Sequence, residues 1–206
     1  METIKNASAV PPETHPLRPF LPPNARVLML GSFPPPRERW SIDFYYPNYI
    51  NDMWRVLGHV FFADRLYFVD EAHRTFRLER IKPFLGAKGI ALFDTATIVR
   101  RLKANASDKF LEVVEPTNIA ALIRRLPCLQ AVVTTGQKAT DTLLNTLQHS
   151  SQASPCEPAI GQSATFSIDQ RPLRFYRMPS TSRAYPLALE KKAAFYAKMF
   201  QELRML

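Results

Sequence analysis

Two patterns of hydrophobic positions alternate along the chain and predict alternating strands and helices. Short apolar runs bordered by glycine indicate buried strands, at 26–31, 89–96 and 130–136. Two later segments have the alternating or apolar pattern of strands, at 164–168 and 173–178. Apolar stripes spaced by three and four positions predict helices, at 51–62, 71–89, 115–127 (with Thr117 as N-cap), 137–148 and 186–204.

This order of elements predicts a three-layer α/β domain with a mostly parallel sheet. Ligands of such folds bind at the carboxyl ends of the strands. Loops rich in glycine, proline, hydroxyl groups or arginine follow four predicted strands, at 31–36, 93–101, 134–139 and 178–186. The sequence therefore predicts a site where these loops converge.

The chain of 206 residues has the length of one domain. Residues 1–24 are rich in proline and lack periodicity, which predicts an extended arm laid on or near a domain spanning 25–206. No apolar run is long enough for a membrane helix or a signal peptide, so a cytoplasmic protein without a membrane partner is expected.

Metal-ligating side chains are few and scattered. The two cysteines, Cys128 and Cys156, have no CxxC spacing and cannot supply a four-thiolate site. The histidines form no HxxxH or HExxH pair and lie at His15, His59, His73 and His149. We therefore expect neither a metal nor a cofactor.

Charge separates the candidate partners. The formal net charge is +9, and eight Lys or Arg against two Glu lie between Arg171 and Leu206. Such a surplus favours a polyanion such as DNA, although a solvated basic surface remains the alternative. The GxxxxGK[ST], GxGxxG and GxSxG motifs are absent, which disfavours P-loop nucleotidases, dinucleotide enzymes and serine hydrolases of that type.

Three segments carry candidate chemistry. In "GSFPPP" (31–36), glycine permits close approach of a ligand to the backbone and three prolines hold the loop rigid, unless it is only a stiff crossover. In "FYYPNYINDMW" (44–54), a tyrosine could stack on a base and Asn51 could contact it or a water, unless Asn51 is a plain helix N-cap. In "MPSTSRAYP" (178–186), amides and hydroxyls could hold phosphate, or cap the last helix.

Taken in order, "LMLGSFPPP", "YYPNYINDMW", "GIALFDT", "AVVTTGQKA" and "MPSTSRAYP" resemble the motifs of the uracil-DNA glycosylase superfamily. The nearest branch has a GSxP first motif and includes hypoxanthine- or uracil-processing enzymes. The resemblance implies an α/β/α domain with a central, mostly parallel four-stranded sheet. It also implies a monomeric, metal-free enzyme that hydrolyses the N-glycosidic bond of a damaged base flipped out of DNA.

The resemblance also implies roles for individual residues. The base pocket would consist of Gly31, Ser32, Phe33, Pro34, Tyr45 or Tyr46, and Asn48. The DNA backbone would contact Gly136, Lys138, Ser180, Thr181, Ser182 and Arg183. Catalysis would fall to Asn51 or Asp94, with Asp43 as a further candidate.

Two positions depart from the family pattern. Phe33 stands where most branches place an Asp or Asn that activates water, and Met178 stands where some place a His. Losing one positioned group can cost about 10²-fold in rate. A monofunctional DNA glycosylase of base excision repair, of reduced activity, is therefore one hypothesis. A non-catalytic DNA-binding or damage-sensing module is the second, and an enzyme for free nucleotides or nucleosides the third.

Overall fold

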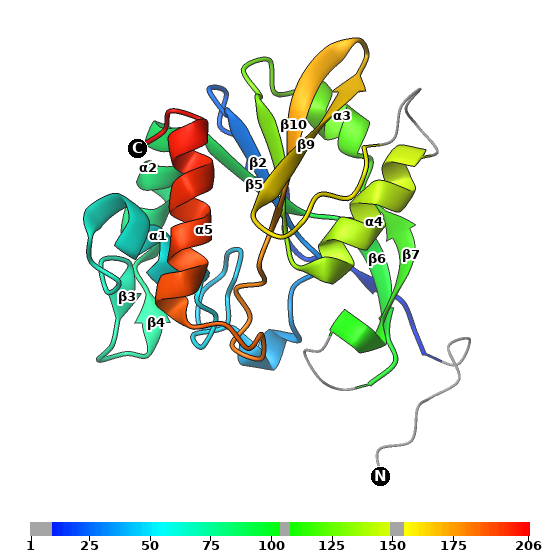
Figure 1. Cartoon of the computed structure of the whole chain (residues 1–206). Coiled ribbons are helices and arrows are strands. Elements are labelled where there is room, and N and C mark those ends of the chain that lie inside the picture. The colour runs from blue at the N-terminus through cyan, green and yellow to red at the C-terminus, as the bar shows by residue number, and fades with distance from the viewer. Residues whose placement is uncertain (1–9, 104–107, 149–154) are drawn as a thin grey trace.

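The computed structural model describes residues 10–103, 108–148 and 155–206. Its main sheet has five strands in the order β5-β2-β8-β10-β9 (Figure 1). The strands span Val27–Gly31 (β2), Ile90–Asp94 (β5), Ala131–Thr135 (β8), Gln162–Ile168 (β9) and Arg171–Met178 (β10). The first four in this spatial order are parallel and β9 is antiparallel to β10. The mostly parallel sheet is confirmed, but it has five strands where four were expected.

The fifth strand joins the sheet through a tight hairpin. Asp169 and Gln170, the two residues between β9 and β10, both have positive φ, at 51° and 64°. Two such residues make the turn whose twist matches that of paired strands. The hairpin therefore adds β9 to the edge of the sheet beside β10.

Helices lie on both faces of the sheet. The helices α1 (Met53–Phe62), α2 (Leu78–Lys88) and α5 (Leu189–Glu202) lie on one face, and α3 (Ile119–Arg124) and α4 (Gln137–Gln148) on the other (Figure 1). None of the helices in the described part of the chain is long and apolar enough to cross a membrane.

Two predicted helices are too long. The helix expected at 71–89 begins only at Leu78, because a small hairpin, β3 (Val69–Asp70) with β4 (Thr75–Phe76), precedes it. The helix expected at 115–127 is also shorter, since α3 spans only Ile119–Arg124. Its N-cap is Asn118, whose side chain accepts a hydrogen bond from the Ala121 amide at 3.0 Å. The expectation for Thr117 is wrong, because its hydroxyl instead donates to the Asp94 carbonyl at 2.7 Å.

A second, antiparallel sheet was not predicted. It has the order β1-β6-β7, with β1 at Glu13–Thr14, β6 at Ala96–Arg101 and β7 at Leu111–Pro116. The exposed residues of these strands leave no clear alternation, and β6 and β7 pair with a register shift. The sequence pattern therefore gave little signal for them.

Residues 10–24 of the expected arm lie against the domain. They supply β1, which pairs with β6, and Phe20 exchanges backbone hydrogen bonds with Leu92 of β5 at 3.0 and 2.9 Å. Residues 1–9 lie outside the described residues.

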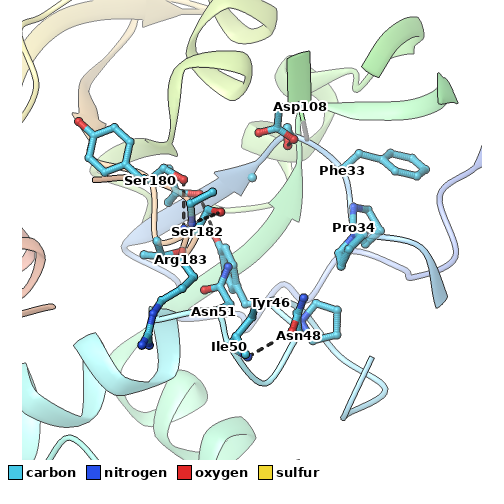
Figure 2. A pocket seen from close by; sticks show the side chains of 18 of the residues that line it. Phe33, Pro34, Tyr46, Asn48, Ile50, Asn51, Asp108, Ser180, Ser182 and Arg183 are labelled. Atoms are coloured by element: carbon cyan, nitrogen blue, oxygen red, sulfur yellow. Dashed lines mark hydrogen bonds between the residues drawn. The ribbon is translucent and has the colours of Figure 1, made fainter. Parts of the chain in front are cut away.

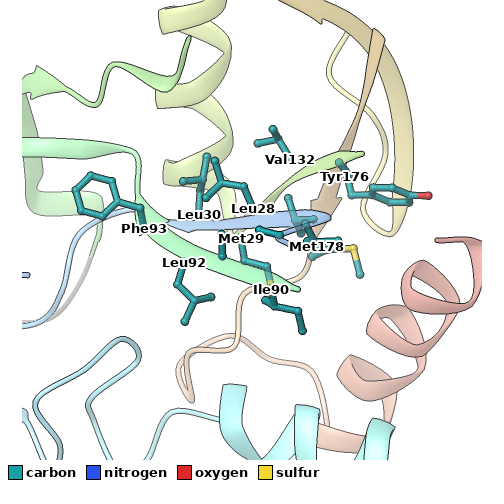
Figure 3. Close-up of a cluster of buried hydrophobic side chains, with 14 of the residues drawn as sticks. Leu28, Met29, Leu30, Ile90, Leu92, Phe93, Val132, Tyr176 and Met178 are labelled. Atoms are coloured by element: carbon teal, nitrogen blue, oxygen red, sulfur yellow. The ribbon is translucent and has the colours of Figure 1, made fainter. Parts of the chain in front are cut away.

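The core is centred on β2, every residue of which is buried. Its side chains pack with those of β5, β8 and β10 (Figure 3). Met178, only 1% exposed, belongs to this core. Position 178 is therefore a packing position.

Candidate functional site

A cavity of about 540 Å³ lies at the carboxyl ends of the parallel strands (Figure 2). The last residues of β2, β5 and β8 and the loops that follow β2 and β10 contribute to it, together with the segment that leads into α1 and the segment of Asp108 and Lys109. The predicted residues that line it are Gly31, Ser32, Phe33, Pro34, Tyr45, Tyr46, Asn48, Asn51, Asp94, Ser180, Thr181, Ser182 and Arg183. Gly136 and Lys138 are not among its lining residues, and neither is Asp43.

The floor of the cavity is built where β2 and β5 end side by side. Gly31 is the register partner of Asp94, and a Cβ atom on Gly31 would lie 2.4 Å from Asp94 Oδ1. Only glycine leaves room for the carboxylate there. The side chain of Asp94 is 9% exposed. An almost buried carboxylate therefore lines the cavity.

Phe33 contributes its backbone more than its ring. The ring points away from the cavity (Figure 2) and packs with Ala96, Val99 and Leu111 of the second sheet. Hydrogen bonds to its carbonyls fix the loop that follows, since Trp40 Nε1 donates to Pro35 at 2.8 Å and Arg101 Nη2 donates to Pro34 at 3.1 Å. The absence of a polar group at position 33 thus has a structural cause, which is the small apolar cluster beneath the loop.

The two tyrosines of the YY pair have different environments. The Tyr45 hydroxyl donates to the Arg18 carbonyl at 2.9 Å, and the residue is 3% exposed. Tyr46 has a positive φ of 49°, which is uncommon for a bulky residue, and its hydroxyl shares a 3.2 Å hydrogen bond with Thr135 Oγ1. Burial raises the pKa of both phenols, so both are neutral donors at physiological pH. Tyr46 is the more exposed of the two.

Asn51 is not the N-cap of α1, because the N-cap is Asp52, but the Asn51 side chain contacts the first turn of that helix. Its Oδ1 accepts a hydrogen bond from the Met53 amide at 2.9 Å, so the side chain does satisfy the start of α1. It also lines the cavity (Figure 2), which places the Nδ2 amide group and the second Oδ1 lone pair within reach of a bound molecule. Asn48 Oδ1 accepts from the Ile50 amide at 3.2 Å and so shapes the same loop.

The late serine–threonine segment forms the opposite lip of the cavity. Its hydroxyls do not cap α5, whose N-cap is Ala188. Ser180 Oγ instead accepts from the Ser182 amide at 3.2 Å, and Ser182 Oγ from the Ala184 amide at 3.3 Å. These short turns leave Arg183 exposed at the rim, with a side chain 70% accessible.

A buried ion pair joins the two lips. Lys192 of α5, 1% exposed, donates to Asp52 Oδ2 at 2.9 Å and to the Ser182 carbonyl at 2.9 Å. The Asp52 amide in turn donates to the Thr181 carbonyl at 2.9 Å. The segment that carries Asn51 and the segment that carries Arg183 are thereby fixed to each other.

Gly136 and Lys138 lie beside the cavity without lining it. Gly136 has a φ of 124°, and a Cβ there would lie 3.4 Å from Ser180. Lys138, in the first turn of α4, lies near enough to Asp108 to lower the pKa of that carboxyl. The glycine therefore supports the late segment, and the lysine adds positive charge behind the rim.

Charges of both signs surround the cavity. The pKa of Asp108 is raised, mainly because its carboxyl group is desolvated, and the Ser32 hydroxyl, which donates to Asp108 Oδ1 at 2.8 Å, offsets part of the rise. The cations Arg39, Lys109 and Arg183 line the cavity as well. The carboxylates Asp94 and Asp108 can accept hydrogen bonds, and the basic side chains can contact phosphate groups.

The basic surplus of the last 36 residues is not concentrated here. Of its eight Lys and Arg residues, Arg183 alone is among those that line the cavity. Arg174 and Arg204 line a second hollow together with Arg26 at the amino end of β2, and Lys192 is buried. Asp43, a further catalytic candidate, pairs with Arg37 on the surface, with its side chain 68% exposed.

Several residues of the site were not predicted from the sequence. They are Ile50, Asp108, Lys109, Thr135 and Tyr185 in the lining, and His15 directly behind it. Thr135, at the end of a predicted strand, had a usable signal. Asp108 and His15 had none, because the second sheet and the arm bring them here. No group of three His, Cys, Asp or Glu residues in the described ranges could hold a metal ion.

Comparison with known proteins adds a likeness of fold. No protein-family model matches the chain, and no curated protein sequence matches it. Among solved structures, it is similar to the solution NMR structure of a protein from Methanosarcina acetivorans described as a "putative Uracil DNA glycosylase". The TM-score is 0.59 at 20% identity, over 91% of this chain and 96% of that one. The likeness establishes a shared mixed α/β fold.

Proposed function

We propose that this protein is a monofunctional DNA glycosylase of base excision repair. It would hydrolyse the N-glycosidic bond of a deaminated base, uracil or hypoxanthine, flipped out of DNA. The observation that carries the proposal is the convergence of Asn51 and Asp94 on one cavity at the strand ends. The fold shared with the Methanosarcina acetivorans protein, and the resemblance of the motifs in sequence order, support it.

The cavity suits a base that has left the stack. Its volume, about 540 Å³, lies in the usual range of small-molecule sites, and its lining mixes aromatic rings with a few polar groups. The exposed part of Tyr46 offers a ring for stacking, and the Asn51 amide offers a hydrogen bond to a base edge or a water.

The chemistry follows from the two polar side chains. A water held by Asn51 and Asp94 attacks the anomeric carbon, a C–O bond forms, and the C–N bond to the base breaks. The base leaves with the bonding electron pair and is then protonated by solvent, while Asp94 takes the proton of the water. The negative charge of Asp94 also stabilises the positive charge that develops on the sugar. No metal or cofactor enters this scheme.

We infer a monomeric, cytoplasmic enzyme. DNA would approach it at the lips of the cavity. Arg39, Lys109 and Arg183 lie at the cavity and can contact phosphates, with Lys138 and Gly136 beside them. Ser180, Thr181 and Ser182 supply hydroxyls and amides of the kind that bind phosphate oxygens.

A second function, a non-catalytic DNA-binding or damage-sensing module, is favoured by one observation. Phe33 and Met178, at positions that carry polar catalytic groups in relatives of the proposed family, are both buried in apolar clusters. Neither side chain could turn into the cavity without repacking of its apolar cluster.

One experiment separates the two. Duplex and single-stranded DNA carrying uracil, hypoxanthine or xanthine is incubated with excess protein and treated with alkali, which cuts abasic sites. We expect cleavage at one or more deaminated bases, none in undamaged DNA, and much slower but measurable single-turnover cleavage in Asp94→Asn. Tight and selective binding of damaged DNA without any cleavage would establish the binding module instead.

A further inference from the structure

A histidine from the N-terminal arm lies directly behind the catalytic candidate Asp94. His15 Nε2 is 2.9 Å from Asp94 Oδ2, and the imidazole is 3% exposed. Its ring centroid lies 4.7 Å from that of Phe93 and 5.2 Å from that of Phe33. The scheme proposed above makes no use of this buried titratable group.

The contacts of the other ring nitrogen are compatible with a proton on Nε2. Nδ1 lies 3.1 Å from the Leu17 amide and 2.9 Å from the Leu17 carbonyl. A neutral ring can accept from that amide, and a charged ring can donate to that carbonyl. In both states Nε2 carries the proton and donates it to Asp94 Oδ2.

Hydrogen bonds between the N-terminal arm and the rest of the domain fix the position of the His15 ring. The His15 amide donates to the Thr97 carbonyl at 2.8 Å, and Glu13 accepts two hydrogen bonds from Arg101 at 3.2 and 3.1 Å. The Tyr45 hydroxyl binds the Arg18 carbonyl three residues further on. The chain is therefore fixed by hydrogen bonds both before and after His15.

These contacts divide the two oxygens of Asp94 between two tasks. Oδ2 accepts from His15, while Oδ1 lies against Gly31, which lines the cavity. A carboxylate that accepts a hydrogen bond from a rigid donor keeps one orientation.

We propose that His15 is a positioning residue for Asp94, and that the N-terminal arm is thereby part of the active site. The inference rests on the proposed function, because the purpose of the pair is to aim Asp94 Oδ1 at the water. The alternative is a core histidine whose hydrogen bonds only stabilise the fold.

Two variants of His15 separate these roles. His15→Phe keeps an aromatic ring for the contacts with Phe33 and Phe93 but removes the donor, whereas His15→Gln keeps an N–H donor at a similar distance from the backbone but has no ring. Single-turnover cleavage rates are measured with saturating protein on the preferred duplex, together with the Kd for that DNA and the melting temperature.

For a positioning role, we expect His15→Phe to lower the rate by about 10- to 100-fold with little change in Kd. His15→Gln should recover part of the rate, even where its melting temperature is the lower of the two. In an Asp94→Asn background, His15→Phe should have no further effect, because the group that it positions is already disabled.

Three outcomes would overturn the inference. They are an unchanged rate in His15→Phe, a rate loss that persists in full in the Asp94→Asn background, and a His15 Nε2 without its proton in ¹⁵N NMR of the wild type. A wild type that cleaves no duplex overturns the proposed function itself and, with it, the catalytic purpose of the pair. The NMR result would still show whether the pair forms.

Discussion

At the scale of single residues, the close contact between Gly31 and Asp94 decides what the floor of the cavity can be. The glycine was predicted to permit close approach of a ligand. The structure shows that its first neighbour is the Asp94 carboxylate, 2.4 Å from where a Cβ would lie. The missing side chain at Gly31 therefore makes room for the Asp94 carboxylate, which is the protein's own catalytic candidate, and not only for a ligand.

The first prediction concerns this contact. Gly31→Ala should displace the Asp94 carboxylate and lower the cleavage rate by about 10²-fold, because a shift of roughly 1 Å misplaces the group. Gly86→Ala is the matched control, since no atom lies within 4 Å of a Cβ at Gly86. Single-turnover rates and melting curves of both variants test it, and a fully active Gly31→Ala would contradict it.

The second prediction concerns the two roles of Asn51. Asn51→Asp keeps an oxygen that can accept from the Met53 amide, so its stability should stay near that of the wild type. Asn51→Ala loses this bond and should cost about 1 kcal/mol in the free energy of unfolding.

Both variants lose the amide N–H group and should cleave at least about 10²-fold more slowly. Urea unfolding and cleavage assays give the two readouts. If Asn51→Asp retained the full rate, the role of Asn51 would be limited to its hydrogen bond with the first turn of α1.

At the scale of elements, α5 holds the two lips of the cavity together. Its Lys192 binds Asp52, at the start of α1, and the carbonyl of Ser182 in the late segment. Buried ion pairs add little net stability, but breaking one leaves an uncompensated charge. The pair therefore fixes one geometry of the cavity more than it strengthens the fold.

The third prediction follows from that asymmetry. Lys192→Met should lower the free energy of unfolding by about 3–5 kcal/mol, because Asp52 stays buried with only the exposed Arg183, 4.0 Å away, as a charged partner. The neighbouring Lys191 is exposed, so Lys191→Met should change it by less than about 0.5 kcal/mol. Urea titration followed by circular dichroism measures both. Equal effects of the two variants would contradict the prediction.

At the scale of the whole molecule, positive charge is distributed over both ends of the sheet. Arg183 lies at the cavity, whereas Arg174 and Arg204 lie in the hollow lined by Arg26. Under the proposed function, the net charge of +9 would attract DNA from all directions, but only the cations at the cavity would contact it in the productive orientation.

The fourth prediction uses this distribution. Arg183→Ala should weaken DNA binding for every sequence and make the slope of log K against log salt shallower by about 1, as expected for one lost phosphate contact. Arg204→Ala removes the same charge from the far end and should leave the slope unchanged. Fluorescence anisotropy over a range of salt concentrations measures both slopes, and a similar change in the two would remove Arg183 from the interface.

The local sequence carries most of the information about the main sheet. Runs such as 26–31 and 130–136 are apolar, short and ended by glycine, and each became a buried parallel strand. The second sheet escaped prediction because its strands are half-exposed and irregularly paired. Their stability comes from partners distant in the chain, which a local pattern does not contain.

By itself, the sequence determined the alternation of strands and helices and the rim at which the candidate residues meet. Those features follow from local hydrophobic periodicity and from the common direction of parallel strands. The tertiary structure alone decided that Phe33 faces an apolar cluster, that Lys192 joins the two lips, and that His15 binds Asp94. His15 and Asp94 are 79 positions apart. Only packing of the arm against β5 and β6 brings them within hydrogen-bonding distance.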